Sequence, residues 1–180
     1  MKASDDLRKE HEAVLFALKI LEKMSQVHKT TGSLDIKDAA GMVEFLRVFA
    51  DKCHHGKEEG FLFPAYESRG VPRENGPIGA MLYEHELGRS YIQGMDKALH
   101  QSPANAVEFF GQAQKYIDLL KAHIEKENNV LFPLGDNFLS TEANSTLLEQ
   151  FEHHEEEVIG KGKHEELHAQ LDRWEEKYLE

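Results

Sequence analysis

The sequence predicts an all-α protein: an up-and-down four-helix bundle built from a duplicated helical hairpin, plus two C-terminal helices. Three observations predict this fold class. Apolar residues recur every three or four positions along the chain, clusters of turn-forming residues separate these stretches, and one short sequence occurs twice, at residues 53–64 and 122–133. Because each copy closes one hairpin, we expect two pseudo-equivalent halves that pack together.

The first helix is expected to begin at Ser4, a suitable N-cap, because Asp5 and Asp6 follow it where acidic side chains favour the helix dipole. Its apolar stripe contains Leu7, His11, Val14, Leu18 and Leu21. His11 is therefore expected to face the interior of the bundle.

The second helix is expected to open at Asp35, another suitable cap, and to run until Pro64 disrupts it. Its apolar side carries Ala39, Val43, Leu46, Ala50, Cys53, His54, Glu58 and Phe61. His54 and Glu58 therefore continue the face that we expect to be buried.

The second hairpin repeats this organisation. A loop over residues 69–76 ends at Pro77, which suits the first position of a helix, and the stripe that follows contains His85. Ser102 and Pro103 repeat the cap-and-proline start for a fourth helix. The inward side of that helix carries Phe109, Ala113, Tyr116, Leu120, His123, Glu127 and Leu131.

Residues 136–180 are expected to form a helical extension packed on the same domain as the bundle of residues 1–135. Residues 140–159 and 167–178 have helical periodicity, and a Gly-Lys-Gly break separates them. We expect these two helices to cover the outside of the bundle or a subunit contact.

His164 and His168 match the zinc-protease pattern His-Glu-x-x-His by letter. The extended form of that pattern needs Gly and His where this chain has Leu171 and Trp174, and few residues follow His168 to supply a distant third ligand. In a segment rich in Glu and His, we expect the match to be accidental.

Composition limits the classes of function. The 33 acidic and 21 basic residues give this 180-residue chain a formal charge of −12, which opposes binding to nucleic acid and to anionic membranes. Cys53 is the single cysteine, so no internal disulfide can form. The N-terminus shows no apolar signal core, and no segment is apolar enough to span a membrane. We expect a cytoplasmic protein with no nucleic-acid or membrane partner.

Both copies of the duplicated sequence contain His-x-x-x-Glu. Positions i and i+4 share one face of an α-helix, about 6 Å apart along the axis, so each copy can aim an imidazole and a carboxylate at one metal ion. A fainter echo, Glu-His-Glu, occurs in the first helix and again in the third. The inward metal ligands expected from these patterns are His11, His54, Glu58, His85, His123 and Glu127.

This ligand set narrows the choice of metal. Two buried carboxylates without a Lys or Arg on their faces would each cost several kcal/mol unless cations neutralised them. Structural zinc favours thiolates, and calcium and magnesium favour oxygen ligands. Four imidazoles with two carboxylates able to bridge favour a pair of iron or manganese ions, with zinc as a substitute.

Three other residues are weaker candidates. His55 and Glu59 share the i, i+4 spacing, but the second copy has Ile124 and Asn128 there, so the internal comparison leaves His55 only a side approach to a metal. Tyr116 lies on the same face as the ligands, either as a hydrogen-bond donor to them or as an ordinary core tyrosine. Cys53 is expected to be a small buried apolar residue rather than a redox thiol.

The order of these residues, with Leu-Phe-Pro after each pair, resembles the hemerythrin-like (HHE cation-binding) family of four-helix di-iron proteins over residues 4–133. The resemblance implies two iron ions joined by an oxo or hydroxo group and by the carboxylates of Glu58 and Glu127. It implies that His11 and His54 bind one iron and that His85 and His123 bind the other.

The chain departs from the oxygen-carrying hemerythrins, which have a His-x-x-x-His pair in the third helix. Here Arg89 and Met81 stand four residues after and four residues before His85. This departure argues against reversible oxygen carriage by that mechanism. The chain is more similar to four-His members, which include iron-centre repair proteins and iron- or oxygen-sensing domains.

Three classes of function stay open. We favour a non-heme di-iron protein that binds or senses oxygen, nitric oxide, peroxide or iron itself, rather than a dedicated catalyst. The second is a di-iron enzyme or repair factor for oxidative or nitrosative stress. The third is a metal-stabilised interaction module, in which the ions only hold the helices together. Each is compatible with a protein partner or a homo-oligomer.

Overall fold

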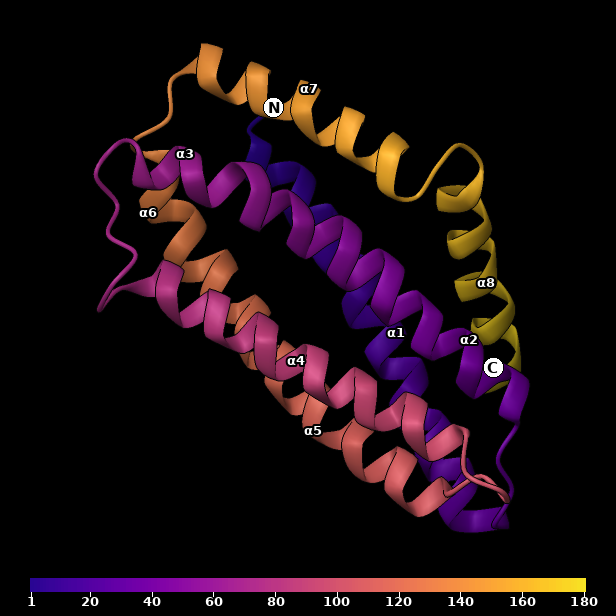
Figure 1. Ribbon diagram of the computed structural model, residues 1–180. Helices are drawn as coiled ribbons and strands as arrows, with labels where there is room; N and C mark the ends of the chain where they lie inside the picture. Colours follow the sequence, from indigo (N-terminus) through magenta and orange to yellow (C-terminus); the bar gives the residue numbers. More distant parts are fainter.

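A computed structural model describes residues 1–180, which form helices and connecting turns without any strand. Four antiparallel rods make the bundle (Figure 1). The rods are α1 (Ala3–Thr31); α2 (Ile36–Phe45) with η1 (Leu46–His55), η2 (Glu58–Leu62) and α3 (Phe63–Glu67); α4 (Pro77–Leu99); and α5 (Ala106–Lys126) with η3 (Glu127–Leu131) and α6 (Phe132–Asp136). The predicted all-α bundle is therefore confirmed.

Two further helices lie outside the four rods, as the sequence predicts. The first, α7 (Thr141–Val158), packs against α1, η1 and η2, and the second, α8 (Lys163–Tyr178), turns back along α1 near the start of α2 (Figure 1). Ser140 caps α7, because its side chain accepts a hydrogen bond from the backbone N–H of Ala143 at 3.0 Å. None of the helices combines the length and apolarity that a membrane span requires.

The second and fourth rods widen into π-helical turns at the duplicated sequence. The N–H of Phe63 donates to the carbonyl of Glu58, and the N–H of Phe132 donates to that of Glu127, each five residues back. The expectation that Pro64 ends the second helix is wrong, since the chain stays helical to Glu67. The wide turn relieves the crowding that a proline ring causes against the preceding α-helical turn.

Two of the expected helix starts are also wrong. Helix α1 begins at Ala3, and Ser4 lies inside it, buried, with its hydroxyl donating to Asp136 at 2.9 Å. Helix α5 begins after Asn105, whose side chain accepts the N–H of Glu108 at 3.0 Å, and not at Ser102. Ser4 uses its hydroxyl for a long-range contact instead of a cap, while Asn105 provides the side-chain cap of α5 three residues after Ser102.

The expected starts at Asp35 and Pro77 are confirmed. The side chain of Asp35 accepts a hydrogen bond from the backbone N–H of Asp38 at 3.0 Å. Pro77 is the first residue of α4, where its missing N–H costs nothing.

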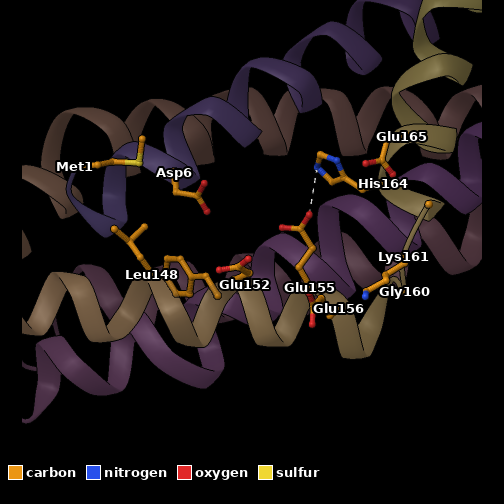
Figure 2. Close-up of a pocket in the computed structure, with 12 residues that line it drawn as sticks. Met1, Asp6, Leu148, Glu152, Glu155, Glu156, Gly160, Lys161, His164 and Glu165 are labelled. Carbon is orange, nitrogen blue, oxygen red and sulfur yellow. Dashed lines mark ion pairs between the residues drawn. The ribbon is translucent and has the colours of Figure 1, made fainter.

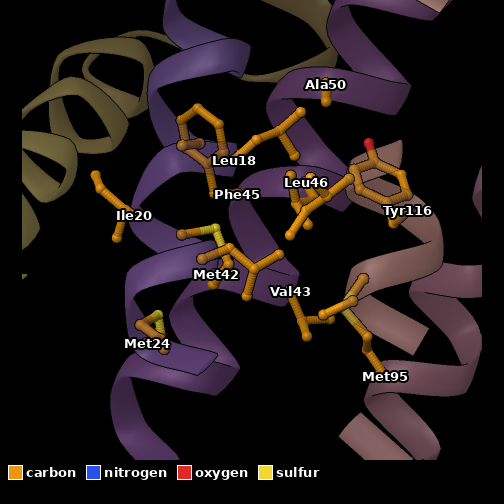
Figure 3. Packing of buried hydrophobic residues seen from close by; sticks show 14 of the residues in the cluster. Leu18, Ile20, Met24, Met42, Val43, Phe45, Leu46, Ala50, Met95 and Tyr116 are labelled. Carbon is orange, nitrogen blue, oxygen red and sulfur yellow. The ribbon is translucent and has the colours of Figure 1, made fainter. Parts of the chain in front are cut away.

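The apolar core is divided into two clusters by a polar layer. The larger cluster fills the bundle between α1, α2, η1, α4, α5 and α8, and Figure 3 shows Leu18, Phe45 and Met95 within it. The smaller cluster joins the start of α1 to α3, α6 and α7. On α1, Leu7 belongs to the smaller cluster and Val14 to the larger. The histidine between them, His11, therefore lies in the polar layer.

Candidate metal centre

The polar layer contains all six side chains that the sequence predicts as metal ligands, contributed by all four rods. Each is at most 1% exposed. They are His11, His54, Glu58, His85, His123 and Glu127. The structure thus brings the whole predicted set together at the level where η1, η2 and η3 begin or end.

Glu58 lies between imidazoles of two different rods. Its Oε1 is 3.1 Å from Nε2 of His54, and its Oε2 is 3.0 Å from Nε2 of His85. One carboxylate therefore presents one oxygen to each side of the layer, which is the arrangement that a carboxylate bridging two ions requires.

Glu127 occupies the corresponding place in the second half. Its Oε2 is 3.3 Å from Nε2 of His11, while its Oε1 contacts Nε2 of His123 and is 3.9 Å from Nε2 of His85. Each of the two carboxylates therefore lies next to imidazoles that come from different rods.

The inward atoms of this layer are the main unsatisfied polar atoms of the protein. Nine buried side-chain nitrogen or oxygen atoms lack a hydrogen-bond partner. Eight of them are Nε2 of the four histidines and the carboxylate oxygens of Glu58 and Glu127. Leaving so many buried polar atoms unpaired would cost several kcal/mol in total, and cations satisfy all eight. The donor set therefore fits metal ions.

The outward nitrogen of each histidine is held in place. The Nδ1–O distances are 2.8 Å from His11 to Asn128, 3.4 Å from His54 to Glu10, 2.9 Å from His85 to Glu59 and 3.3 Å from His123 to Glu84. A hydrogen bond at Nδ1 orients the ring and leaves Nε2 with a lone pair for a metal.

A scan against family models matches residues 2–135 to the hemerythrin HHE cation-binding domain. The chain belongs to this family. It is 29% identical over 124 residues to the iron-sulfur cluster repair protein YtfE of Dickeya chrysanthemi, an alignment that covers 64% of this chain and 54% of that protein. The chain thus spans about half the length of this relative. No solved structure matches the chain.

The residues that contact the outward Nδ1 atoms of the histidines in this HHE domain occupy matching positions in the two hairpins. Glu10 and Glu84 directly precede His11 and His85, and they contact His54 and His123 on the next rods. Glu59 and Asn128 each directly follow one of the two inward glutamates, Glu58 and Glu127. Sequence reasoning noticed the Glu-His-Glu echo but missed these roles. The sequence signal for these roles was that a glutamate directly precedes the histidine in both copies of Glu-His-Glu, as Glu10 before His11 and Glu84 before His85.

A lysine stands behind each outer glutamate. Lys57 Nζ is 3.2 Å from both carboxylate oxygens of Glu10, and Lys126 contacts Glu84. Burial acts to raise the pKa of Glu10, but His54 and Lys57 outweigh it and lower that pKa. These lysines were also missed, although Lys precedes the motif glutamate in both copies.

His55 lies against the HHE centre as well. The donor atoms of the layer form two groups, and within each group they lie no more than 4.8 Å apart. One group contains His55, Glu58, His85 and His123, and the other contains His11, His54, Glu58 and Glu127. The ring of His55 stacks on that of His85 with 3.8 Å between the centroids, and Nδ1 of His55 is 3.3 Å from Asp51. The internal comparison gave His55 little weight because the second copy has no equivalent, whereas the structure places it beside the other donors.

Burial and acidic neighbours act in opposite directions on the pKa values of His54, His85 and His123. Burial opposes protonation, but Glu58 and Glu10 raise the pKa of His54 to about 10. The pKa of His85 is raised to about 11 against burial, by Glu127 and Glu58 first, and that of His123 to about 9, by Glu127 first. Protons and metal ions therefore compete for the same nitrogens.

The two other weaker candidates from the sequence, Tyr116 and Cys53, do not belong to this group of imidazoles. Tyr116 is buried in the larger apolar cluster, where its hydroxyl has no hydrogen-bond partner and contacts none of the ligands by a hydrogen bond. Cys53 is buried with Sγ 3.9 Å from Glu10, and burial followed by the charge of Glu10 raises the pKa of its thiol to about 12. A thiol with so high a pKa is unreactive at neutral pH.

Proposed function

We propose that this HHE protein is a non-heme di-iron protein that binds or senses a small oxidant or diatomic ligand, namely oxygen, nitric oxide or peroxide. The observation that supports the proposal is the set of eight unpaired inward atoms, four imidazole nitrogens and the four oxygens of two carboxylates that lie between those imidazoles. Imidazole and carboxylate ligands on facing bundle helices favour iron, with manganese or zinc as substitutes. The formal charge of −12 supports a small ligand rather than nucleic acid as the partner.

We assign the ligands by the two groups that the geometry forms. His11 and His54 would hold one ion, His85 and His123 would hold the other with His55 beside them, and Glu58 and Glu127 would bridge. A bound iron pair supplies one-electron redox change and open positions for a small ligand. The apolar clusters above and below exclude water, while Glu10, Glu59, Glu84 and Asn128 orient the imidazoles.

The proposal is tested by anaerobic reconstitution with ferrous iron. Excess metal is removed, iron is counted per chain, and the electronic spectrum is recorded before and after air and, separately, nitric oxide. We expect two irons per chain and new absorption bands with each gas. No retained iron, or a spectrum indifferent to both gases, would overturn the proposal and favour a structural metal module.

A second candidate is repair of damaged iron centres under oxidative or nitrosative stress. It rests on the similarity to the protein named for iron-sulfur cluster repair, of which this chain spans 54%. The test is to incubate an oxidatively damaged iron-sulfur enzyme with the iron-loaded chain or with the metal-free chain. Recovery of activity with the iron-loaded chain alone would favour this role, and equal recovery with both would exclude it.

A further inference from the structure

Arg89 on α4 contacts the outward partners of two neighbouring imidazoles. Its Nε donates to both carboxylate oxygens of Asp51, at 2.9 and 3.1 Å, and its Nη2 donates to Glu59. Asp51 is 3.3 Å from Nδ1 of His55. Glu59 is 2.9 Å from Nδ1 of His85. One guanidinium therefore stands behind His55 and His85 at the same time.

These two imidazoles come from different rods, His55 from η1 and His85 from α4. Their rings are stacked, with 3.8 Å between the centroids and 16° between the planes, and their donor atoms belong to the same group of possible metal ligands. A hydrogen bond at Nδ1 fixes the rotation and tautomer of each ring and leaves Nε2 free for a metal ion. The contacts of Arg89 therefore couple the orientations of two rings that face one ion.

The buried lysine of the first hairpin has a different role. Lys57 stands behind His54 alone among the proposed ligands, and its other contacts are with Asp6 and Glu155, which Figure 2 labels on α1 and α7. An ammonium is a single point charge, whereas a guanidinium presents its donors in a fixed planar fork. Arg89 can therefore hold two carboxylates in a fixed relation to each other.

The guanidinium also separates the two imidazoles from solvent. Arg89 and Asp51 line a surface hollow of about 500 Å³, and the Arg89 side chain is 32% exposed, whereas His55 and His85 are at most 3% exposed. Without the guanidinium, the carboxylates of Asp51 and Glu59 would lose their shared cation and repel each other. Both imidazoles would then lose a fixed partner together.

We propose, on the basis of the di-iron centre proposed above, that Arg89 is a positioning residue that holds His55 and His85 together as ligands of one ion. Arg89 stands one turn after His85 on the same helix, so it can act on His85 through Glu59 and on His55 through Asp51 without touching the ion. A lysine at this position would keep the charge but not the fixed geometry of the fork.

The test uses the full-length, metal-free chain and Co²⁺ as the probe, since the visible absorption bands of Co²⁺ depend on the number and arrangement of its ligands. The wild type, Arg89→Met and Arg89→Lys are titrated with Co²⁺, and the bands are recorded at each step. In both variants we expect one of the bound Co²⁺ ions to bind more weakly by about tenfold or more. We also expect the bands of that ion to shift, which a role of Arg89 in folding alone would not cause.

Arg47→Met is the matched control. Arg47 lines the same hollow and pairs with Asp96 at 3.5 Å, but Asp96 is not a partner of any proposed ligand histidine. We expect the Co²⁺ affinities and bands of Arg47→Met to match those of the wild type. Arg89→Lys guards against misfolding because it keeps the positive charge, and circular dichroism checks that its helix content is unchanged.

Wild-type Co²⁺ affinities and bands in Arg89→Met or in Arg89→Lys would overturn the positioning role, as would the same change in Arg47→Met. A wild type that binds no Co²⁺ would overturn the metal centre and the positioning role together. The proposed function fails separately, if the iron-loaded wild type responds to neither oxygen nor nitric oxide while the Arg89 variants still change the Co²⁺ bands.

Discussion

Lys57 and Glu10 form a buried ion pair directly behind His54, one of the proposed metal ligands. Both Nζ–O distances are 3.2 Å, the lysine side chain is 1% exposed, and the same carboxylate lies 3.4 Å from Nδ1 of His54. Lys126 and Glu84 repeat the pair behind His123, but there the lysine side chain is 48% exposed. The same lysine–glutamate ion pair therefore has a buried lysine in the first hairpin and a half-exposed lysine in the second.

This difference predicts unequal effects of removing the two lysines. Lys57→Met removes a buried cation that Glu10 shares with Asp6 and Glu155, and we expect the free energy of unfolding to fall by about 3–5 kcal/mol. Lys126→Met removes a pair that water screens, so we expect a loss under about 1 kcal/mol. Urea denaturation of both metal-free variants measures the difference. Equal losses would show that burial of Lys57 does not strengthen its pair.

The position of His55 beside Glu58, His85 and His123 predicts a partial loss of metal binding when His55 is replaced. In His55→Gln, we expect the centre to keep its fold and one tightly held iron, while the ion held by His85 and His123 is lost to a chelator at least tenfold faster than in the wild type. His153→Gln serves as the control, because that imidazole is exposed. Iron counted over time during dialysis against the chelator gives the result. Wild-type retention of both irons in His55→Gln would remove His55 from the ligand set.

The raised histidine pKa values predict two pH effects. The folded, metal-free chain keeps protons on His54, His85 and His123 to about pH 9–11, whereas the unfolded chain releases them near 6.5. These histidines therefore stabilise the metal-free fold fully below about pH 6.5, and the contribution is lost as the pH rises to about 9–11. Metal must displace the same protons, so its apparent affinity should rise over that interval.

Zinc titration calorimetry in two buffers with different ionisation enthalpies measures the protons released at pH 7.5. We expect more than one proton per chain. Urea denaturation at pH 7 and pH 9 without metal checks the stability effect, which should have the opposite sign from the affinity effect. A metal affinity that did not change with pH would contradict the competition between protons and metal.

The duplication made most of the centre predictable, and its limits explain what was missed. The repeated His-x-x-x-Glu pairs and the two single histidines lead to six side chains that the fold places in one layer. His55 has no partner in the second copy, so a comparison of the two copies discounts it. The roles of Glu10 and Lys57 depend on how α1 packs against η1, which helical periodicity does not specify. The continuation past Pro64 depends on a π-helical turn, for which no sequence rule was available.

The packing of Tyr66 against Gly135 predicts a steric block to substitution where the two hairpins close. A Cβ atom at Gly135 would come within 2.2 Å of the ring of Tyr66, a side chain that is fully buried in the smaller apolar cluster. Gly135→Ala must therefore displace that ring or the backbone of α6. We expect this overpacking to lower the free energy of unfolding by about 1–3 kcal/mol.

Gly111 provides the matched control, since it also lies in a helix but a Cβ there meets nothing within 4 Å. Gly111→Ala should raise the free energy of unfolding by about 0.5–1 kcal/mol, because alanine loses less backbone entropy than glycine when it enters a helix. Thermal or urea denaturation of the two variants thus gives opposite signs for the same chemical change. If Gly135→Ala were as stable as Gly111→Ala, the close approach of α6 to Tyr66 would be wrong. The position of η3 and Glu127, which lead directly into α6, would then need revision as well.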